Sequence, residues 1–258
     1  MGSAGTQGPL WSGIADTWAE VMEPLRTPLY DAMLDAAGVK AGTSLLDAGC
    51  GSGAASKRAA LRGARVAGLD AAEGMIKRAC QQVPDGDFRV GDLEGLPFED
   101  NTFEAVVASD SVQYTENKVA AIAEMARVCK PGGTVVIGIW DVPEKNEQRA
   151  IFAAMENELP EPPKGGPFAL SELGLLEDMI RKAGLTVEGQ QSVPVEVRFS
   201  NVDQFWQVTG SSGNTKAMMR VVGEEKIKKA ALAAVEQFIQ PSGEVTMQNS
   251  FRYVKAHP

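Results

Sequence analysis

The chain has 258 residues, of which 44% are hydrophobic, and a formal net charge of −9. This length and composition are ordinary for one α/β domain with a sizeable core. The negative charge disfavours DNA or RNA as a partner, because enzymes of nucleic acids usually present a basic face to the phosphates. No apolar run in the sequence approaches the roughly 20 residues that span a bilayer, and no secretory leader is visible. We therefore expect a cytoplasmic protein with no nucleic-acid or membrane partner, acting as a monomer or homodimer.

The cysteines and the single histidine offer little metal or redox chemistry. Cys50, Cys80 and Cys129 are far apart in the sequence, and His257 is the next-to-last residue. This spacing argues against a disulfide framework and against a zinc site built on cysteine and histidine. We therefore expect no metal site and no histidine base, and we expect His257 to lie in a disordered tail.

The first 40 residues are expected to form a tail followed by a helical cap. Residues 1–10 predict a disordered tail, and residues 11–40 predict one or two helices broken near Pro24 and Pro28. Trp18 and several other apolar side chains lie in these helices. Such a surface can pack permanently on the edge of a sheet or can cover a ligand pocket, and the sequence leaves both possibilities open.

The most informative segment, residues 45–53, has the sequence LLDAGCGSG. It predicts a buried strand that ends in Asp47, followed by a tight turn whose glycines let the backbone approach a ligand. The next segment predicts a helix whose N-terminus points into the same crevice. Asp70 ends a second apolar run, and a carboxylate there can accept hydrogen bonds from both hydroxyls of a ribose. A glycine turn combined with such an acid is the nucleoside-binding arrangement of a doubly wound sheet.

Two cofactor classes fit this arrangement, and Asp47 separates them. Gly49, Gly51 and Ala54 also satisfy the dinucleotide pattern G-x-G-x-x-G/A, which keeps an NAD-dependent oxidoreductase as an alternative. A carboxylate at Asp47 would repel the pyrophosphate of a dinucleotide but attract a ligand that has an amino group and no phosphate. S-adenosyl-L-methionine is such a ligand. A third interpretation of residues 45–53 is a glycine-rich turn between a strand and a helix that binds no ligand.

The D-x-G-x-G-x-G series of residues 47–53 resembles the first motif of class I S-adenosylmethionine-dependent methyltransferases, of the kind called methyltransferase type 11. Three later segments follow in the order of that family: the strand end at residues 91–93, the LPFEDNTFE turn at 96–104 and the KPGG turn at 130–133. Each segment alone is a weak signal, whereas four in order at this spacing are specific. The resemblance continues less specifically over most of the remaining chain.

The resemblance implies an α/β fold with a doubly wound, Rossmann-like sheet of seven strands, mostly parallel with an antiparallel last strand, and helices on both faces. The alternation of strands and helices over residues 43–140 independently predicts a parallel sheet. We expect a single methyltransferase domain over 1–258, in which 43–140 bind the cofactor and 141–258 carry a helical insertion that recognises the substrate.

Beyond the core, sequence patterns predict further elements. The first are a helix over 141–157 with Ile151, Phe152 and Met155 on one face, and a loop over 159–167. A helix follows that is capped by Ser171 and ended by Gly184, with Leu173, Leu176, Met179 and Ile180 inward. The last are a strand over 193–199, helices over 202–240 interrupted at 210–213, and a strand over 245–253. Two late strands joined through a helical insertion match the antiparallel end of a methyltransferase sheet.

The resemblance also implies which residues contact the cofactor. In the family an acid at the position of Asp92 takes the adenine amino group, and the apolar residue after it packs on the ring. The complete expected set is Trp18, Asp47, Ala48, Gly49, Cys50, Gly51, Asp70, Ala71, Met75, Gly91, Asp92, Leu93, Ser109, Asp110 and Gln113.

Methyl transfer is an in-line displacement, so the protein mainly has to align the reactants and exclude water. A general base helps only where the acceptor must lose a proton, and the candidates after the fourth strand are Asp110, Gln113 and Tyr114. Asp110 could equally serve only as a helix N-cap. A non-catalytic, methyltransferase-like binding subunit is a third reading of the chain, because no catalytic residue is indispensable.

Aromatic side chains gather in the segments expected to recognise the acceptor: Trp11, Trp18, Tyr30, Trp140, Phe168, Phe205 and Trp206. Together with the loop rich in helix breakers, they indicate an apolar-lined cavity under a mobile cover. The sequence therefore predicts methyl transfer to a small, partly apolar metabolite, on a nitrogen, oxygen or carbon atom.

Overall fold

Seven strands form one mixed sheet in the order β3-β2-β1-β4-β5-β7-β6. The computed structural model describes residues 2–161 and 166–258. The strands are β1 (Ser44–Ala48), β2 (Arg65–Asp70), β3 (Asp87–Val90), β4 (Phe103–Ser109), β5 (Cys129–Trp140), β6 (Thr186–Phe199) and β7 (Val245–His257). The first five run parallel, and β7 runs antiparallel to both β5 and β6. The predicted fold class is therefore confirmed.

Helices cover both faces of this sheet, because successive strand residues point to opposite sides. Leu45 of β1 packs in one hydrophobic cluster with side chains of α4 (Thr27–Ala36) and α5 (Ala54–Leu61), whereas Leu46 packs in a second cluster with side chains of α7 (Lys118–Val128) and α9 (Leu175–Lys182). The helix α6 (Glu73–Gln82) contacts α5 and the strands β2 and β3. No helix in the described part of the chain is long and apolar enough to cross a membrane.

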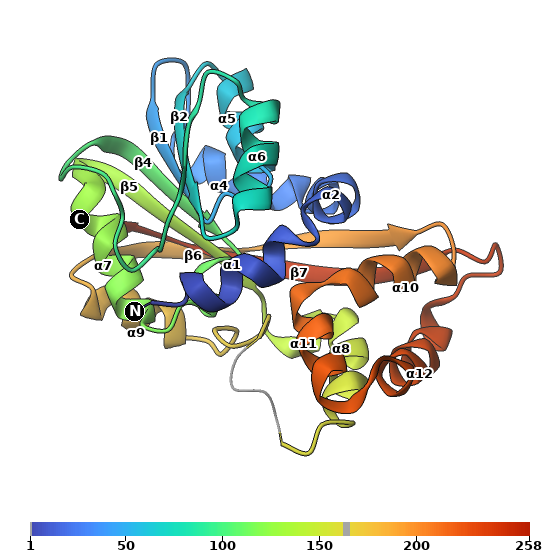
Figure 1. The fold of residues 1–258 in the computed structure, drawn as a ribbon. Coiled ribbons are helices and arrows are strands. Elements are labelled where there is room, and N and C mark those ends of the chain that lie inside the picture. Colours follow the sequence, from blue (N-terminus) through green and yellow to red (C-terminus); the bar gives the residue numbers. More distant parts are fainter. Residues whose placement is uncertain (1, 162–165) are drawn as a thin grey trace.

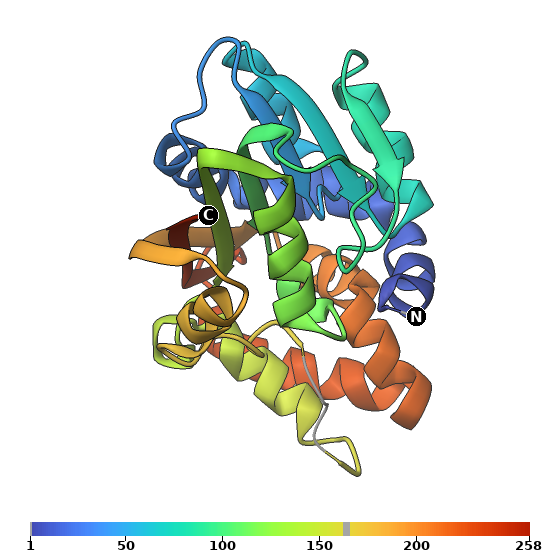
Figure 2. The ribbon, with the colours of Figure 1, turned by 90° about the vertical axis from the view of Figure 1, so that its left-hand side faces the viewer.

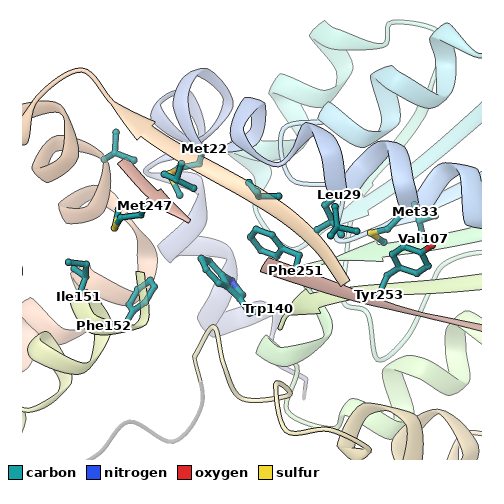
Figure 3. Packing of buried hydrophobic residues seen from close by; sticks show 14 of the residues in the cluster. Met22, Leu29, Met33, Val107, Trp140, Ile151, Phe152, Met247, Phe251 and Tyr253 are labelled. Atoms are coloured by element: carbon teal, nitrogen blue, oxygen red, sulfur yellow. The ribbon is translucent and has the colours of Figure 1, made fainter. Parts of the chain in front are cut away.

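The predicted helical insertion forms a separate layer. It consists of α10 (Val202–Ser211), α11 (Gly213–Val222) and α12 (Glu224–Val235) between β6 and β7, and α8 (Gln148–Glu156) packs on α12. In both ribbon views this layer lies away from α5 and α6, with α1 (Ala4–Ser12) between the two parts (Figures 1 and 2). Aromatic packing ties the insertion to the sheet, since the ring centroid of Trp140 lies 4.6 Å from that of Phe251 and 6.1 Å from that of Phe152 (Figure 3).

The expectation of a disordered tail over residues 1–10 is wrong for the described residues. Helix α1 begins at Ala4 and packs on α6 and α11. The predicted breaks in the following helices are confirmed, because Pro24 and Pro28 occupy first-turn positions of α3 (Glu23–Leu25) and α4. Two further short pieces, α2 (Ala15–Thr17) and the π-helix Trp18–Met22, precede them.

Two local expectations at the C-terminal side are also wrong. Ser171 caps no helix: α9 begins four residues later, and the Ser171 hydroxyl donates to the carbonyl of Trp140 at 3.0 Å. Leu173, expected to face inward, is therefore exposed. His257 lies in β7, not in a disordered tail, and its ring contacts the Gly133 carbonyl and Glu188.

The other late elements are present but differ in extent: the helix expected over 141–157 is α8, which begins at Gln148, and the strand expected over 193–199 is β6, which begins at Thr186. Ile151, Phe152 and Met155 share the buried face of α8, and Leu176 and Ile180 are buried in α9. Gly184, with φ of 90°, follows the end of α9. The predicted loop over 159–167 lies partly outside the described residues, because 162–165 are not among them.

Candidate active site

Four parallel strands end at the same edge of the sheet, and the loops that follow them surround one cavity. Asp47 belongs to β1, Asp70 ends β2, Asp92 follows β3 and Asp110 follows β4. The cavity comprises about 850 Å³ of space not filled by protein atoms, part of which is open to solvent. Parallel sheets of this type bind ligands at this edge. Of the residues that the resemblance assigned to the cofactor, all except Ala48 and Gln113 line this cavity.

The two exceptions lie just behind the lining. The carbonyl of Ala48 accepts a hydrogen bond from the Ser111 hydroxyl at 2.8 Å. The Gln113 amide donates to Asp110 Oδ1 at 3.1 Å, and the side chain is buried. Gln113 therefore orients a lining carboxylate and does not face the cavity itself.

The glycine turn after β1 is shaped for close approach. Gly51 has φ of 53°, and a Cβ atom there would lie 2.7 Å from Glu23 Oε1. Gly49 has φ of 82°, and its Cβ would lie 2.2 Å from the Ser111 Cβ. Both positions combine a left-handed backbone with crowding, so only glycine fits them without displacing a neighbour.

Asp70 is held firmly at the end of β2. Its Oδ2 accepts from the Gly51 N–H and its Oδ1 accepts from the Ala72 N–H, both at 2.9 Å. Burial raises the pKa of this carboxyl, although the hydrogen bonds from the backbone oppose the effect. The side chain therefore links the glycine turn to the second strand and presents its carboxylate to the cavity.

Asp47 is almost fully buried at the base of the cavity. Its Oδ2 accepts from the Ser56 hydroxyl at 2.7 Å. Burial, assisted by the negative charges of Glu23 and Asp70, raises the pKa of Asp47 to about 7, although the hydrogen bond from Ser56 opposes this. A positive charge placed in the cavity would relieve this repulsion.

Glu23 is a lining residue that the sequence analysis missed. It lies at the start of α3 and is 2% exposed; its Oε1 accepts from the Ser52 N–H at 2.7 Å and its Oε2 from the Ser52 hydroxyl at 2.5 Å. Burial raises the pKa of Glu23 despite these bonds. Three carboxylates thus line one cavity, those of Glu23 and Asp47, which are buried, and that of Asp70, which is partly buried.

Helix α1 reaches the end of the cavity where Asp92 lies. The N–H of Ala4 donates to Asp92 Oδ2 at 3.1 Å, and the N–H of Glu94 donates to Oδ1 at 3.0 Å. Gln7 and Trp11 of α1 also line the cavity. The N-terminal segment therefore covers the site that the resemblance assigns to adenine. The sequence did not indicate this cover, because residues 1–10 were expected to form a disordered tail.

Asp110 lies in a strained position at the end of β4. Its φ is 52°, a left-handed conformation that costs a residue other than glycine about 1 kcal/mol or more. Its carboxylate accepts from Arg26 Nε at 3.1 Å and from Gln113, and burial raises its pKa although Arg26 opposes this. Ser111, not Asp110, precedes the 3₁₀ turn Val112–Tyr114, and neither side chain caps it, so the N-cap alternative is wrong.

A second cavity adjoins the first. The two share Trp11, Trp18, Arg26, Asp110 and Tyr114 as walls. The remaining lining of the second cavity comes from the π-helix, β5, α8, the loop at Pro167, and the insertion helices with the residue that joins them: Met22, Trp140, Gln148, Phe152, Pro167, Val208, Thr209, Ser212 and Asn214. The segments expected to recognise an acceptor therefore do converge beside the first cavity.

The predicted aromatic set divides between cavity walls and core. Trp11, Trp18 and Trp140 line the second cavity, and Tyr30 lines the first. The other three, Phe168, Phe205 and Trp206, line neither of these two cavities, and Phe205 is fully buried in the core.

Among the described residues, no group of three or more His, Cys, Asp or Glu side chains could hold a metal ion.

Comparison with known proteins identifies the central part of the chain. Residues 46–137 match the family model described as a methyltransferase domain. Over these residues the chain is similar to a methyltransferase domain. The family resemblance drawn from the motifs is thereby confirmed, and the match disfavours the dinucleotide alternative.

Relatives of this methyltransferase domain share its core. Demethylmenaquinone methyltransferase of Renibacterium salmoninarum is 38% identical over 120 residues, which are 46% of this chain and 51% of the relative. Malonyl-[acyl-carrier protein] O-methyltransferase of Yersinia pestis is 39% identical over 95 residues, or 37% of this chain and 36% of the relative. The chain thus spans about half the length, or less, of these curated relatives.

Solved structures extend the likeness of the methyltransferase fold to nearly the whole chain. The [4+2]-cyclase SpnF superposes with a TM-score of 0.58 at 20% identity, covering 89% of this chain and 80% of that one. The YcgJ protein from Bacillus subtilis gives a TM-score of 0.56 at 18% identity, covering 88% and 96%. At these identities the likeness concerns the fold alone.

Proposed function

We propose that this methyltransferase uses S-adenosyl-L-methionine and transfers its methyl group to a small, partly apolar metabolite. The observation that carries the proposal is the set of carboxylates around a glycine turn in one cavity: Glu23 and Asp47 are buried there, and Asp70 is partly buried. A phosphate-bearing dinucleotide would add negative charge to this set, whereas a ligand with a sulfonium and an ammonium group would offset it.

The lining residues fit the parts of this co-substrate. Asp70 would accept hydrogen bonds from the ribose hydroxyls, Asp92 from the adenine amino group, and Leu93 would pack on the ring. Asp47 and Glu23 lie deeper and would offset the positive charges. The Ser109 hydroxyl is buried on the cavity wall with no hydrogen-bond partner among the described residues, so it can serve a ligand. When bound, S-adenosyl-L-methionine supplies a methyl group carried on a positively charged sulfur.

Among the three candidates for a general base, we favour Asp110. The Tyr114 hydroxyl accepts a hydrogen bond from the Asn214 amide, and burial raises the pKa of Tyr114 above its usual value, so it keeps its proton at neutral pH. Gln113 has no basic group and instead donates to Asp110. Asp110 lines both cavities, and its raised pKa makes it a stronger base than an exposed carboxylate.

Calorimetry with two ligands tests the proposal. S-adenosylhomocysteine should bind with a micromolar or lower dissociation constant, and NAD should show no measurable binding. Binding of NAD without binding of S-adenosylhomocysteine would overturn the proposal in favour of an oxidoreductase. Binding of S-adenosylhomocysteine without methyl transfer to any member of a broad metabolite panel would favour the non-catalytic subunit.

A further inference from the structure

We propose that the second cavity is the acceptor site and that it takes a hydroxylated aromatic ring, which is methylated on oxygen. This inference rests on the proposed methyltransferase function and adds the chemical class of the acceptor. The cavity comprises about 510 Å³ of space not filled by protein atoms, part of which is open to solvent. The inference rests on the position of this cavity beside the first one, its aromatic walls, the Arg26–Asp110 pair at its boundary and Gln148 in its wall.

The two cavities meet at a boundary made of polar and aromatic side chains. Trp18, Arg26, Asp110 and Tyr114 line both. A molecule in the second cavity can therefore present one atom to the first cavity while its remaining surface stays enclosed. This is the arrangement that an in-line displacement requires, because the acceptor atom must face the methyl group with water excluded.

Aromatic rings form most of the apolar wall. Trp11 lies edge-on to Trp18, with ring centroids 5.0 Å apart, and to Tyr114 at 5.6 Å. Trp140 and Phe152 form the opposite side with centroids 6.1 Å apart, and both are more than 90% buried (Figure 3). Rings arranged edge-on leave faces that favour another flat ring by offset or edge contacts.

The charge at the boundary favours an oxygen acceptor over an amine. Arg26 is 5% exposed, and its guanidinium carbon lies 4.8 Å from the ring centroid of Trp18 and 5.7 Å from that of Trp140. Its cation thus occupies the aromatic faces that would otherwise attract an ammonium group. A hydroxyl beside the pair of Arg26 and Asp110 would donate to the carboxylate and gain stabilisation of its developing negative charge from the guanidinium.

The chemical step balances with these groups. The O–H bond of the acceptor breaks, and its proton passes to the Asp110 carboxylate. The oxygen lone pair forms the new O–CH₃ bond as the bond between methyl and sulfur breaks, and that electron pair stays on sulfur as a neutral thioether. The products are the methyl ether, S-adenosylhomocysteine and protonated Asp110, which returns its proton to water.

A second polar group lies in the wall of the same cavity. Gln148 is 4% exposed, and its Oε1 has no hydrogen-bond partner among the described residues. Its own backbone N–H is already bound to Asn249 Oδ1 at 3.1 Å. A buried acceptor without a donor costs about 1–3 kcal/mol, so a ligand that brings a donor gains from it. The acceptor is therefore expected to carry a second hydroxyl or an N–H group on its ring.

Calorimetry on the protein saturated with S-adenosylhomocysteine tests this assignment with three single-ring probes: catechol, benzylamine and toluene. Catechol should bind at least tenfold more tightly than either of the others. The substitution Gln148→Leu should reduce this preference for catechol over toluene to twofold or less. The matched substitution Gln237→Leu, on the remote 3₁₀ turn Glu236–Phe238, should leave it unchanged.

The outcomes separate the two proposals. Absence of S-adenosylhomocysteine binding would defeat the proposed function itself. Normal binding of S-adenosylhomocysteine, together with tighter binding of benzylamine or equal binding of toluene and catechol, would overturn only the acceptor class. Methyl transfer to catechol should yield a methyl ether and should be lost in Asp110→Asn while catechol still binds. A methyl group found on carbon would also overturn the inference.

Discussion

Two regions build the active site in different ways. The first, residues 43–92, supplies the glycine turn and the acids at the ends of β1, β2 and β3, and its site residues are near neighbours in the sequence or on adjacent strands. The second comprises the N-terminal helices together with the helical insertion. It reaches the site through long-range contacts, such as those of Arg26 with Asp110 and of Glu23 with Ser52. The part of the proposed cofactor site in the first region is thus locally encoded, whereas Glu23 and the proposed acceptor site depend on tertiary packing.

The largest effect should come from closing the glycine turn of the first region. Gly51→Val should weaken S-adenosylhomocysteine binding more than 100-fold. The Cβ of the new side chain would lie 2.7 Å from Glu23 Oε1, and valine would have to adopt the left-handed backbone conformation of this position. Gly42→Val is the matched control, since Gly42 has φ of 84° but an open environment. Calorimetry and thermal unfolding of both variants separate the loss of binding from the effect of backbone strain. Equal affinities of the Gly51→Val and Gly42→Val proteins for S-adenosylhomocysteine would mean that the turn does not face the cofactor.

Removal of the acid at the end of β2 should have the next largest effect. Asp70→Ala should cost about 1.5–3 kcal/mol of cofactor binding for each charge-assisted bond lost, or at least tenfold in affinity. Asp92→Ala should cost less, because Asp92 would make one bond and already accepts from the N–H of Ala4. Titration of both variants with S-adenosylhomocysteine checks the order, and an Asp70→Ala protein with wild-type affinity would remove Asp70 from the site.

The binding of S-adenosyl-L-methionine should depend on pH through Asp47. Burial raises the pKa of Asp47 to about 7, and a cationic ligand favours the ionised form. Affinity should therefore rise roughly tenfold from about pH 5.5 to 7, in proportion to the ionised fraction. Asp47→Asn should remove most of this rise, and an unchanged slope in that variant would assign the titration to another group.

The same group also predicts how stability changes with pH in the protein without ligand. Between about pH 4 and 7 the folded state holds a proton on Asp47 that the unfolded state has lost. The free energy of unfolding should therefore fall as pH rises through this window. Asp47→Asn should flatten the dependence, and denaturant titrations at several pH values measure it.

The smallest predicted effect concerns the second region. The Ala4 N–H donates to Asp92 Oδ2 and would compete with the adenine amino group of the proposed cofactor for it. Ala4→Pro deletes this donor at the first position of a helix, where proline is tolerated, and should raise cofactor affinity about twofold to fivefold. Ala4→Ser keeps the N–H and should match the wild type. Weaker binding in Ala4→Pro would show instead that the contact holds α1 in place over the bound cofactor.

The sequence and its family resemblance were sufficient for a mostly parallel sheet with an antiparallel last strand and for the side chains at the strand ends. Asp47 and Asp70 were predictable because each ends an apolar run, and Asp92 because the resemblance places an acid at the next strand end; parallel strands bring such positions to one edge. Glu23 and Arg26 could not be predicted in the same way. They lie on short helical pieces broken by prolines, and only the packing of those pieces against the sheet brings Glu23 to Ser52 and Arg26 to Asp110.

Three local errors have the same physical origin. The tail prediction for residues 1–10 failed because α1 packs on α6 and α11, which lie far away in the sequence. Ser171 resembled an N-cap by its type, but its hydroxyl bonds to the carbonyl of Trp140. His257 extends β7 because β6 pairs with it as far as Thr186. In each case a tertiary contact overrides a weak local preference.

A crystal structure of the protein with S-adenosylhomocysteine would show directly whether the first cavity binds S-adenosyl-L-methionine. We expect both ribose hydroxyls to lie within hydrogen-bond distance of the Asp70 carboxylate. We expect the adenine ring to lie against Leu93 with its amino group at Asp92. We also expect the sulfur to face the boundary formed by Arg26 and Asp110. A ligand bound elsewhere, or a ribose that does not contact Asp70, would contradict the account.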